Sequence, residues 1–470
     1  FILAFRIPNF MRRLFAEGIF TQIFVPILIE KQRTKNQQIL KKFISETSGN
    51  LIIILTIVVI IAMIFAPHLI RLFAPGFANH STNFMATMML RITMPYLALI
   101  SLVAFYGSIL NSYNYFSIVA FAPALLNLSL IFSAVILRKF VNIPIFALAW
   151  GVLLAGILQL VFVLIFITHK KLLYLPRLNY RLLNFNNCLS KFFILFFGAA
   201  ITQINLMVDN IFASFLTYGS ISWLYYSERL MMLPLGIYGV AVAVVLLPKL
   251  SFYYQNIDWQ KFSRTIDWAL RLLLLLGVLA SIILGILAKP CLATLFQYKN
   301  FTWHDVLMTQ RSLVAFSLGI PFFIIAKSLA TVFYAKKDIL TPLKISIISL
   351  LVNIILNIFL SRLLQHAGIA LASSLSSLIN CLVLLIVLLY YKIYIPQRGW
   401  LKYLLQLTIS SIVTILFLLY LTPISQDWQT HTATWRILHL LIIIILAKLC
   451  YFIVLFFCGL KIKNILYIKV

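Results

Sequence analysis

Long apolar stretches separated by short polar breaks run through the whole sequence. Many of them reach 18 residues or more, which is enough for a helix to cross the ~30 Å hydrocarbon core of a membrane. The pattern therefore predicts an all-α polytopic membrane protein with about thirteen transmembrane helices. The predicted spans are residues 3–29, 49–66, 92–110, 117–137, 144–168, 190–216, 220–248, 266–288, 312–334, 343–361, 367–391, 403–422 and 437–458.

The spans repeat in order along the chain, which is typical of carriers built from two bundles of the same orientation. Three segments match later ones at nearly constant offsets: 6–26 with 229–248, 105–132 with 333–360, and 147–166 with 370–389. The alignment sets Arg6 against Arg229, and Asn127 against Asn353. The fold expected is thus two pseudo-repeated six-helix bundles followed by two further helices.

The same offset predicts the domain boundaries. The helix at 190–216 has no counterpart before residue 1, so the first bundle is expected to lack its first helix and to contain about five of the six. We expect an N-terminal transmembrane lobe at 1–169, a C-terminal lobe at 170–392, and two extra helices at 393–470.

Basic residues are distributed unevenly between alternate connections. One set of connections, which includes residues 30–43, 392–402 and the tail after 459, holds 21 Lys and Arg, and the opposite set holds 9. Cytoplasmic loops of membrane proteins carry the excess of positive charge. The C-terminus is therefore predicted to be cytoplasmic.

Composition narrows the class further. Of 470 residues, 63% are hydrophobic and only 10% are charged, against roughly 25% in soluble domains. A net charge of +28 would suggest nucleic acid in a soluble protein, but here it is explained by basic loops. The five scattered cysteines (188, 291, 381, 450 and 458) are read as core residues, and no metal, cofactor or hydrolase motif is found.

Charged residues inside the first predicted span are the main candidates for a binding site. Arg6, Arg13 and Glu17 fall on one helical stripe, and Arg12 lies about 100° to one side, near Asn9. An arginine in mid-membrane costs roughly 2.5–3.5 kcal/mol, so it should face water or an anion. The alternative is that Arg6 is interfacial and Arg13 pairs with Glu17. Arginine rather than lysine favours a phosphorylated substrate, because the guanidinium fork binds phosphate oxygens in pairs.

Further candidates lie in the second bundle and beside it. Arg229 occupies a Pro/Gly-interrupted span, the kind of helix that often lines a transport site. Asp209 shares a helix face with Thr202 and Asn205, and is either a hydrogen-bonding stripe between helices or a counter-ion to Arg229.

Two more cations complete the set. Lys327 either snorkels to the membrane surface or lines the cavity. Arg311 is placed at the end of an outer loop, where it is a candidate gate partner for Glu17.

Several blocks of the sequence resemble the MurJ/MviN family of bacterial lipid II flippases, within the multidrug/oligosaccharidyl-lipid/polysaccharide exporter superfamily. The resemblance covers essentially the whole chain, and the R-R-L-F-A-E-G block is its most specific part. The segments that carry it are "FRIPNFMRRLFAEGIFTQIFVPIL", "FAPGF", "FSIVAFAPALLN", "IFASFL", "GSISWLYYSERLM", "GVAVAVVLLPKLS" and "LFQYKNFT".

The resemblance implies two lobes around a cationic cavity, and a groove beside the last two helices for a polyprenyl tail. The implied cargo is lipid II, the undecaprenyl-pyrophosphate-linked disaccharide-pentapeptide, carried by alternating access across the bacterial inner membrane. The family's cavity arginines match Arg12 and Arg229 here, and two others would belong to the missing first helix. A monomeric transporter without enzymatic activity, cofactor or nucleic-acid partner is expected.

Rival functions remain open on the sequence alone. Another exporter of the same superfamily, either a polysaccharide-lipid flippase or a drug/cation antiporter, would share the fold. An antiporter, however, would need a cavity that is acidic on balance. A membrane enzyme acting on lipid-linked sugars would carry paired carboxylates in an outer loop, whereas residues 67–91 contain none and residues 423–436 contain only Asp427.

Overall fold

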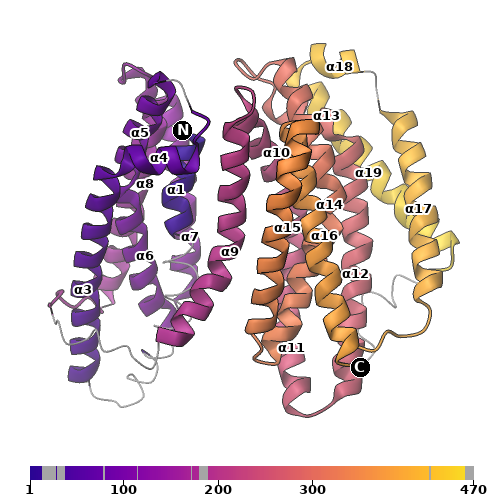
Figure 1. Cartoon of the computed structure of the whole chain (residues 1–470), viewed down its shortest axis with the longest axis horizontal. Helices are drawn as coiled ribbons and strands as arrows, with labels where there is room; N and C mark the ends of the chain where they lie inside the picture. Colours follow the sequence, from indigo (N-terminus) through magenta and orange to yellow (C-terminus); the bar gives the residue numbers. More distant parts are fainter. Residues whose placement is uncertain are drawn as a thin grey trace. The chain divides into compact units, whose positions relative to one another are not determined.

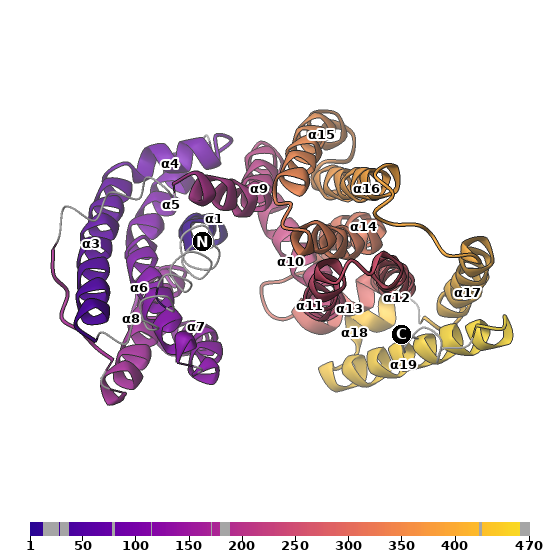
Figure 2. The same cartoon turned by 90° about the horizontal axis from the view of Figure 1, so that it is seen from below.

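The fold is taken from a computed structural model of the chain. It describes residues 1–12, 28, 37–77, 80–113, 115–170, 172–178, 189–422 and 425–460. The chain divides into two compact units, Phe1–Phe215 and Leu216–Val470. Each unit is a bundle of helices (Figures 1 and 2).

The first unit is built from long apolar helices and shorter segments that join them. Its helices are α1 (Ile2–Arg12), α3 (Gln37–Ile64), α4 (Ala66–Phe73), α5 (His80–Thr93), α6 (Pro95–Ser112), α7 (Phe116–Val135), α8 (Phe146–His169) and α9 (Leu189–Ser214), with a 3-10 turn, η2, at Leu137–Lys139.

The second unit has the same character and ends in two helices at its edge. Its helices are α10 (Ser220–Pro234), the π-helix η4 (Leu235–Val240), α11 (Ala241–Gln255), α12 (Trp259–Ile286), α13 (Ala288–Phe296), α14 (Trp303–Ala335), α15 (Leu340–Leu364), α16 (His366–Tyr390), α17 (Trp400–Leu421), α18 (Ser425–Thr430) and α19 (Ala433–Phe457).

The prediction of a polytopic helical membrane protein is confirmed. Eleven helices in the described part of the chain are long and apolar enough to cross a membrane. Helix α9, at 26 residues, matches the further span predicted at 190–216. Only the start of the span predicted at 3–29 is described, as α1, and most of its remainder lies outside the described residues.

Several helices begin earlier than the hydropathy pattern predicts. Helix α3 starts at Gln37 rather than 49, because its polar first turns bury Leu40, Ile44 and Ser48 on one side. Helix α14 starts at Trp303 rather than 312, because Thr302 and Asp305 form a capping box at its N-terminus. Hydropathy finds the apolar centre of a span, whereas these amphipathic and capped ends depend on local hydrogen bonds and packing.

The predicted span at 220–248 is interrupted, as its Pro and Gly residues suggested. Helix α10 ends at Pro234, and six residues of π-helix, η4, separate it from α11. Proline lacks the N–H that an α-helix needs, and π-turns are often found at functional positions. Arg229 therefore lies just before a break in its helix.

The internal repeat is visible in the way the helices pack. Helix α8 packs against both α6 and α7, and its counterpart α16 packs against both α14 and α15. The matched asparagines differ, however: Asn353 is buried and donates to Ser373 Oγ at 3.2 Å, whereas Asn127 is exposed. The repeat thus holds at the level of helix packing and not at this residue.

A close backbone approach at Gly368 shapes the turn between α15 and α16. A Cβ atom at Gly368 would lie 2.0 Å from the carbonyl oxygen of Leu360, well inside contact distance. Because the obstacle is backbone, a side-chain rotation cannot relieve it.

We therefore expect Gly368→Ala to destabilise the second unit by about 1–3 kcal/mol, the usual cost of overpacking. The thermal unfolding midpoint of the purified protein in detergent measures this effect. Gly236→Ala is the matched control, because a Cβ there meets nothing within 4 Å. Equal midpoints for the two variants would show that the α15–α16 contact is looser than described.

Candidate functional site

Arg6 on α1 is held by the last turns of α9, within the first unit. Its Nη1 atom donates to Asn210 Oδ1 at 2.9 Å, and Arg6 is half-buried. Asn210 is itself buried, and its Nδ2 donates to the carbonyl of Leu206 at 2.9 Å. This amide orients the guanidinium of Arg6. Asn9, predicted to lie near Arg12, is half-buried on the same short helix.

Asp209 is buried next to this contact. It is 8% exposed on α9, where Gln203 is also buried and Asn205 is half-buried. The predicted polar face of α9 is therefore turned inward at these positions, while the side chain of Thr202 lies outside the described residues. The pairing of Asp209 with Arg229 stays a prediction, since the two residues belong to different units.

Arg229 is exposed on α10 of the second unit. Its Nη2 donates to the hydroxyl of Tyr225 at 2.9 Å, and the guanidinium lies 4.8 Å from the centre of the same ring. Among the described residues, no carboxylate lies within ion-pair distance of Arg229. A guanidinium steadied by an aromatic ring and left without a carboxylate retains its capacity to bind an anion.

The remaining predicted site residues fall into two groups. The side chain of Arg12, and Arg13 and Glu17 altogether, lie outside the described residues. Lys327 and Arg311 are both exposed on α14. The placement of Arg311 at the end of an outer loop is wrong, because the capping box starts α14 nine residues earlier than expected. The Glu17–Arg311 gate stays a prediction.

A polar cluster around Trp223 was missed from the sequence. The indole of Trp223 on α10 donates from Nε1 to Asp305 Oδ1 at 2.9 Å, and its ring lies 5.0 Å from that of buried His366. His366 in turn contacts the carbonyl of Met308 through Nε2 at 2.9 Å. The cluster ties the first turns of α10, α14 and α16 together. In the sequence, the only hint of this cluster is that Trp223, Asp305 and His366 all lie near the ends of predicted spans.

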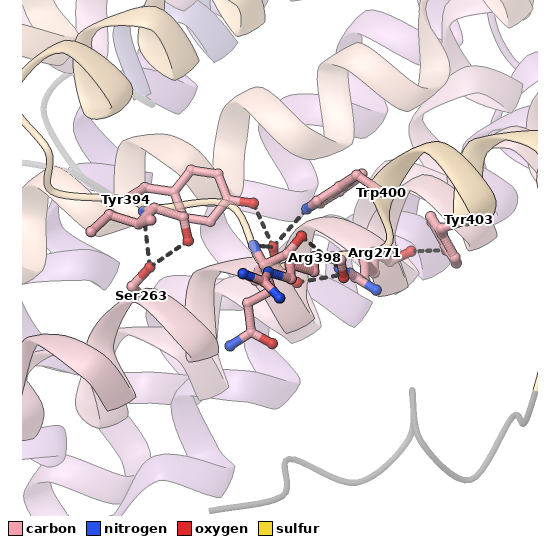
Figure 3. Close-up of polar contacts among 9 residues, drawn as sticks. Ser263, Arg271, Tyr394, Arg398, Trp400 and Tyr403 are labelled. Atoms are coloured by element: carbon pink, nitrogen blue, oxygen red, sulfur yellow. Dashed lines mark hydrogen bonds and ion pairs between the residues drawn. The ribbon is translucent and has the colours of Figure 1, made fainter.

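A second unforeseen cluster lies where the connector 391–399 crosses α12 (Figure 3). Asp267 on α12 is 3% exposed, and its Oδ1 accepts from the Tyr394 hydroxyl at 2.6 Å, the Trp400 indole at 2.7 Å and the Gln397 backbone N–H at 3.1 Å. Its Oδ2 pairs with Arg271 Nε at 2.7 Å. Burial and the bond to Asp267 raise the pKa of the Tyr394 hydroxyl, so this group remains a donor at any physiological pH.

Further contacts close this cluster on both sides (Figure 3). Ser263 Oγ donates to the carbonyl of Ile395 and accepts from its N–H, both at 3.0 Å. The Arg271 guanidinium lies over the Trp400 ring at 5.0 Å and reaches the carbonyl of Arg398 at 3.3 Å. Removing one partner of such a buried pair costs about 3–5 kcal/mol in soluble proteins, because the other charge is left unpaired.

The described residues show neither a metal centre nor a disulfide. No group of three or more His, Cys, Asp or Glu could hold a metal ion in this part of the chain. The four described cysteines are free, with Cys291 and Cys381 buried. The polar side chains described at these positions are cations, amides, carboxylates and aromatic donors, all of which can bind polar ligands.

Comparison with known proteins decides the family. The family model described as "Lipid II flippase MurJ" matches residues 1–439. The chain belongs to this MurJ family. Curated MurJ relatives agree: "Probable lipid II flippase MurJ" of Buchnera aphidicola (strain APS) is 37% identical over 468 residues, covering 99% of this chain and 92% of the relative. Its counterpart in Haemophilus influenzae is 36% identical, covering 99% and 94%.

A comparison with solved structures also matches the chain to a MurJ protein. A structure of "Lipid II flippase MurJ, inward closed conformation" is 29% identical, covers 96% of this chain and 90% of its own, and superposes with a TM-score of 0.80. An inward-facing MATE transporter of the MOP superfamily is 14% identical, with 83% of this chain and 90% of that chain covered and a TM-score of 0.68, which shows a shared fold alone. The expected MurJ family fold is thereby confirmed.

Proposed function

We infer that the chain is a lipid II flippase, a multi-pass protein of the bacterial inner membrane. The observation that carries this function is the match of the MurJ family model along residues 1–439, together with relatives named for the same activity.

The proposed cargo explains the arginines. A pyrophosphate cannot cross hydrocarbon unaided, because an isolated charge in a medium of low dielectric is very costly. Guanidinium groups would replace its water with charge-assisted hydrogen bonds. We propose that Arg12 and Arg229 contact the pyrophosphate, with Arg6, Arg13 and Asn9 as further residues of the binding site. Exposed Arg229, without a carboxylate in reach among the described residues, supports this role.

The proposed mechanism is alternating access. The N-terminal and C-terminal lobes would rock so that the bound head group is presented first to the cytoplasm and then to the periplasm. Structures with the MATE fold exist in both inward-facing and outward-facing conformations. We propose that residues 1–169 form the N-terminal lobe, residues 170–392 the C-terminal lobe, and residues 393–470 the helices that bind the lipid tail. The C-terminus would be cytoplasmic and the protein a monomer. Asp209, Lys327 and the Glu17–Arg311 pair stand as lower-ranking candidates for the cavity and its gate.

Complementation tests the proposed function directly. In cells depleted of their own lipid II flippase, the complete gene should restore growth, and it should restore the fraction of lipid II that reaches the outer leaflet. Arg12→Ala should abolish both while the protein still inserts, whereas Arg71→Ala, an exposed arginine of α4, should abolish neither. Normal growth with Arg12→Ala would remove Arg12 from the site, and failure of the unaltered gene would contradict the function itself.

A further inference from the structure

We propose that Asp267 is a positioning residue for the lipid tail. It anchors the helix pair α17–α19 to α12 through the cluster of Ser263, Asp267, Arg271, Tyr394 and Trp400, which we name the clasp. The proposal deepens the flippase function and rests on it, since the tail in question is the polyprenyl chain of the cargo.

Each helix of the pair α17–α19 packs more extensively on the other than on any third helix (Figure 2). Side chains of α17 bond to backbone atoms near the end of α19: Ser410 Oγ donates to the carbonyl of Tyr451 at 2.9 Å, and Gln406 Nε2 donates to that of Cys458 at 2.8 Å. The inward side chains of α17 form one stripe, namely Tyr403, Leu407, Ser410, Thr414 and Leu418. The two helices therefore form one body.

This body shares an apolar core with α12 and α13, in which Leu407 and Leu292 are both buried, and polar contacts at separate heights fix its position on that core. Near the connector, the clasp holds the first turn of α17, and the Tyr403 hydroxyl also donates to the carbonyl of Arg271. Further along, the Tyr451 hydroxyl donates to the carbonyl of Leu275 at 3.2 Å. Near α18, Arg436 is buried and donates from Nη1 to the carbonyl of Ala293 at 3.2 Å.

The clasp controls direction as well as attachment. Trp400 is the first residue of α17, and its indole is fixed to Asp267 while its ring lies against Arg271. Tyr394 and Gln397 in the connector bond to the same carboxylate oxygen, so the chain approaches α17 along one path. One buried carboxylate thus sets both the connector and the start of the helix.

Large apolar surfaces flank the stripe that faces α19. On α17 they are Leu401, Leu404, Leu405, Ile409, Ile412, Leu416 and Leu419, each at least 43% exposed. Aliphatic side chains of this kind offer a polyprenyl chain dispersion contacts without any polar group to desolvate. The angle at which the clasp holds α17 determines whether this surface meets the tail of a cargo held at the arginines.

Transport of two cargoes that differ only in tail length separates positioning from general stability. We expect Asp267→Ala to lower the rate for undecaprenyl-tailed lipid II about tenfold relative to the rate for a farnesyl-tailed analogue. Asp267→Asn keeps an acceptor oxygen for the three donors, so its ratio of the two transport rates should lie between those of Asp267→Ala and the wild type. An equal loss with both tails would mean that Asp267 only stabilises the fold, and it would overturn the proposal.

Asp258→Ala is the matched control. Asp258 caps the same helix, accepts from the Lys261 N–H at 3.1 Å and lies outside the clasp. The bond from that backbone N–H lowers the pKa of the Asp258 carboxyl, which therefore carries a comparable negative charge. Its removal should leave the ratio of the two rates unchanged.

A distance measurement tests the clasp without any cargo. Spin labels on Arg264→Cys and Lys402→Cys, both exposed positions, would report the separation of α12 and α17 in a background without native cysteines. We expect a narrow distribution in the parent and in Asp258→Ala, and a broad or displaced one in Asp267→Ala. An unchanged distribution in Asp267→Ala would refute the positioning role even if the chain proved to carry a different lipid.

Discussion

Replacing Arg229 by alanine should abolish growth in cells that depend on this chain for lipid II transport. Arg229 is exposed on α10, just before the break at Pro234, and its guanidinium is steadied by Tyr225 rather than neutralised by a carboxylate of the described residues. A charge-assisted hydrogen bond to a phosphate oxygen contributes roughly 1.5–3 kcal/mol, which corresponds to about 10- to 100-fold in binding per bond. We expect the loss of even one such bond to place transport below the rate that growth requires.

Further substitutions at Arg229 and Tyr225 separate the effect of the positive charge from that of the guanidinium geometry. Arg229→Lys keeps the charge but loses the paired donors, so it should retain partial growth. Tyr225→Phe removes the hydroxyl that accepts from Arg229 but keeps the ring beneath it, and should have a milder effect than Arg229→Ala. Arg362→Ala, at an exposed arginine in the last turn of α15, is the matched control and should grow normally. If Arg229→Ala inserts and grows like Arg362→Ala, the cationic-cavity mechanism is wrong.

The fold was largely predictable because the membrane imposes it. A span needs a fixed length of apolar sequence, since every backbone polar group must be satisfied within the helix. The interruption at 220–248 was also visible, because Pro234 and the glycines cannot sustain a regular α-helix. Helix ends were not predictable in the same way: the start of α14 depends on the hydrogen bonds of Thr302 and Asp305, which carry little weight in a hydropathy average.

The candidate site was predictable only in part. Arginines within apolar stretches are conspicuous, because each is costly there unless it has water, a partner or a ligand. Partners are not conspicuous: Arg6 bonds to Asn210 from more than two hundred positions away, and nothing in either local pattern indicates it. Asp267 was missed for a related reason. It lies at the edge of an apolar run, where a carboxylate normally faces water, and it is buried only because the connector folds over it.

Removing the charge from the cargo should weaken binding more than removing Arg229 alone. Consider an analogue of lipid II in which an uncharged linker of equal length replaces the pyrophosphate. If Arg12 and Arg229 each give one charge-assisted bond of roughly 1.5–3 kcal/mol, the analogue loses about 3–6 kcal/mol, or about two to four orders of magnitude in affinity. Competition against labelled lipid II on the purified protein measures this loss. The affinity of a monophosphate analogue should fall between those of lipid II and the neutral analogue.

Testing the neutral analogue on Arg229→Ala shows whether Arg229 contacts the pyrophosphate. In Arg229→Ala the arginine contact is already gone, so the neutral linker should cost only the part that Arg12 supplies, about 10- to 100-fold. The difference between the two losses is the coupling energy between Arg229 and the pyrophosphate, isolated as in a double-mutant cycle. If the neutral linker costs Arg229→Ala as much affinity as it costs the parent, Arg229 does not contact the pyrophosphate. If the neutral analogue binds the parent within a few-fold of lipid II, the tail and sugars hold the cargo and the pyrophosphate does not.

Added salt gives a further check on the charge contacts. Attraction between partly exposed charges is screened within about 8–10 Å at physiological ionic strength, so the affinity advantage of lipid II over the neutral analogue should shrink as the salt concentration rises.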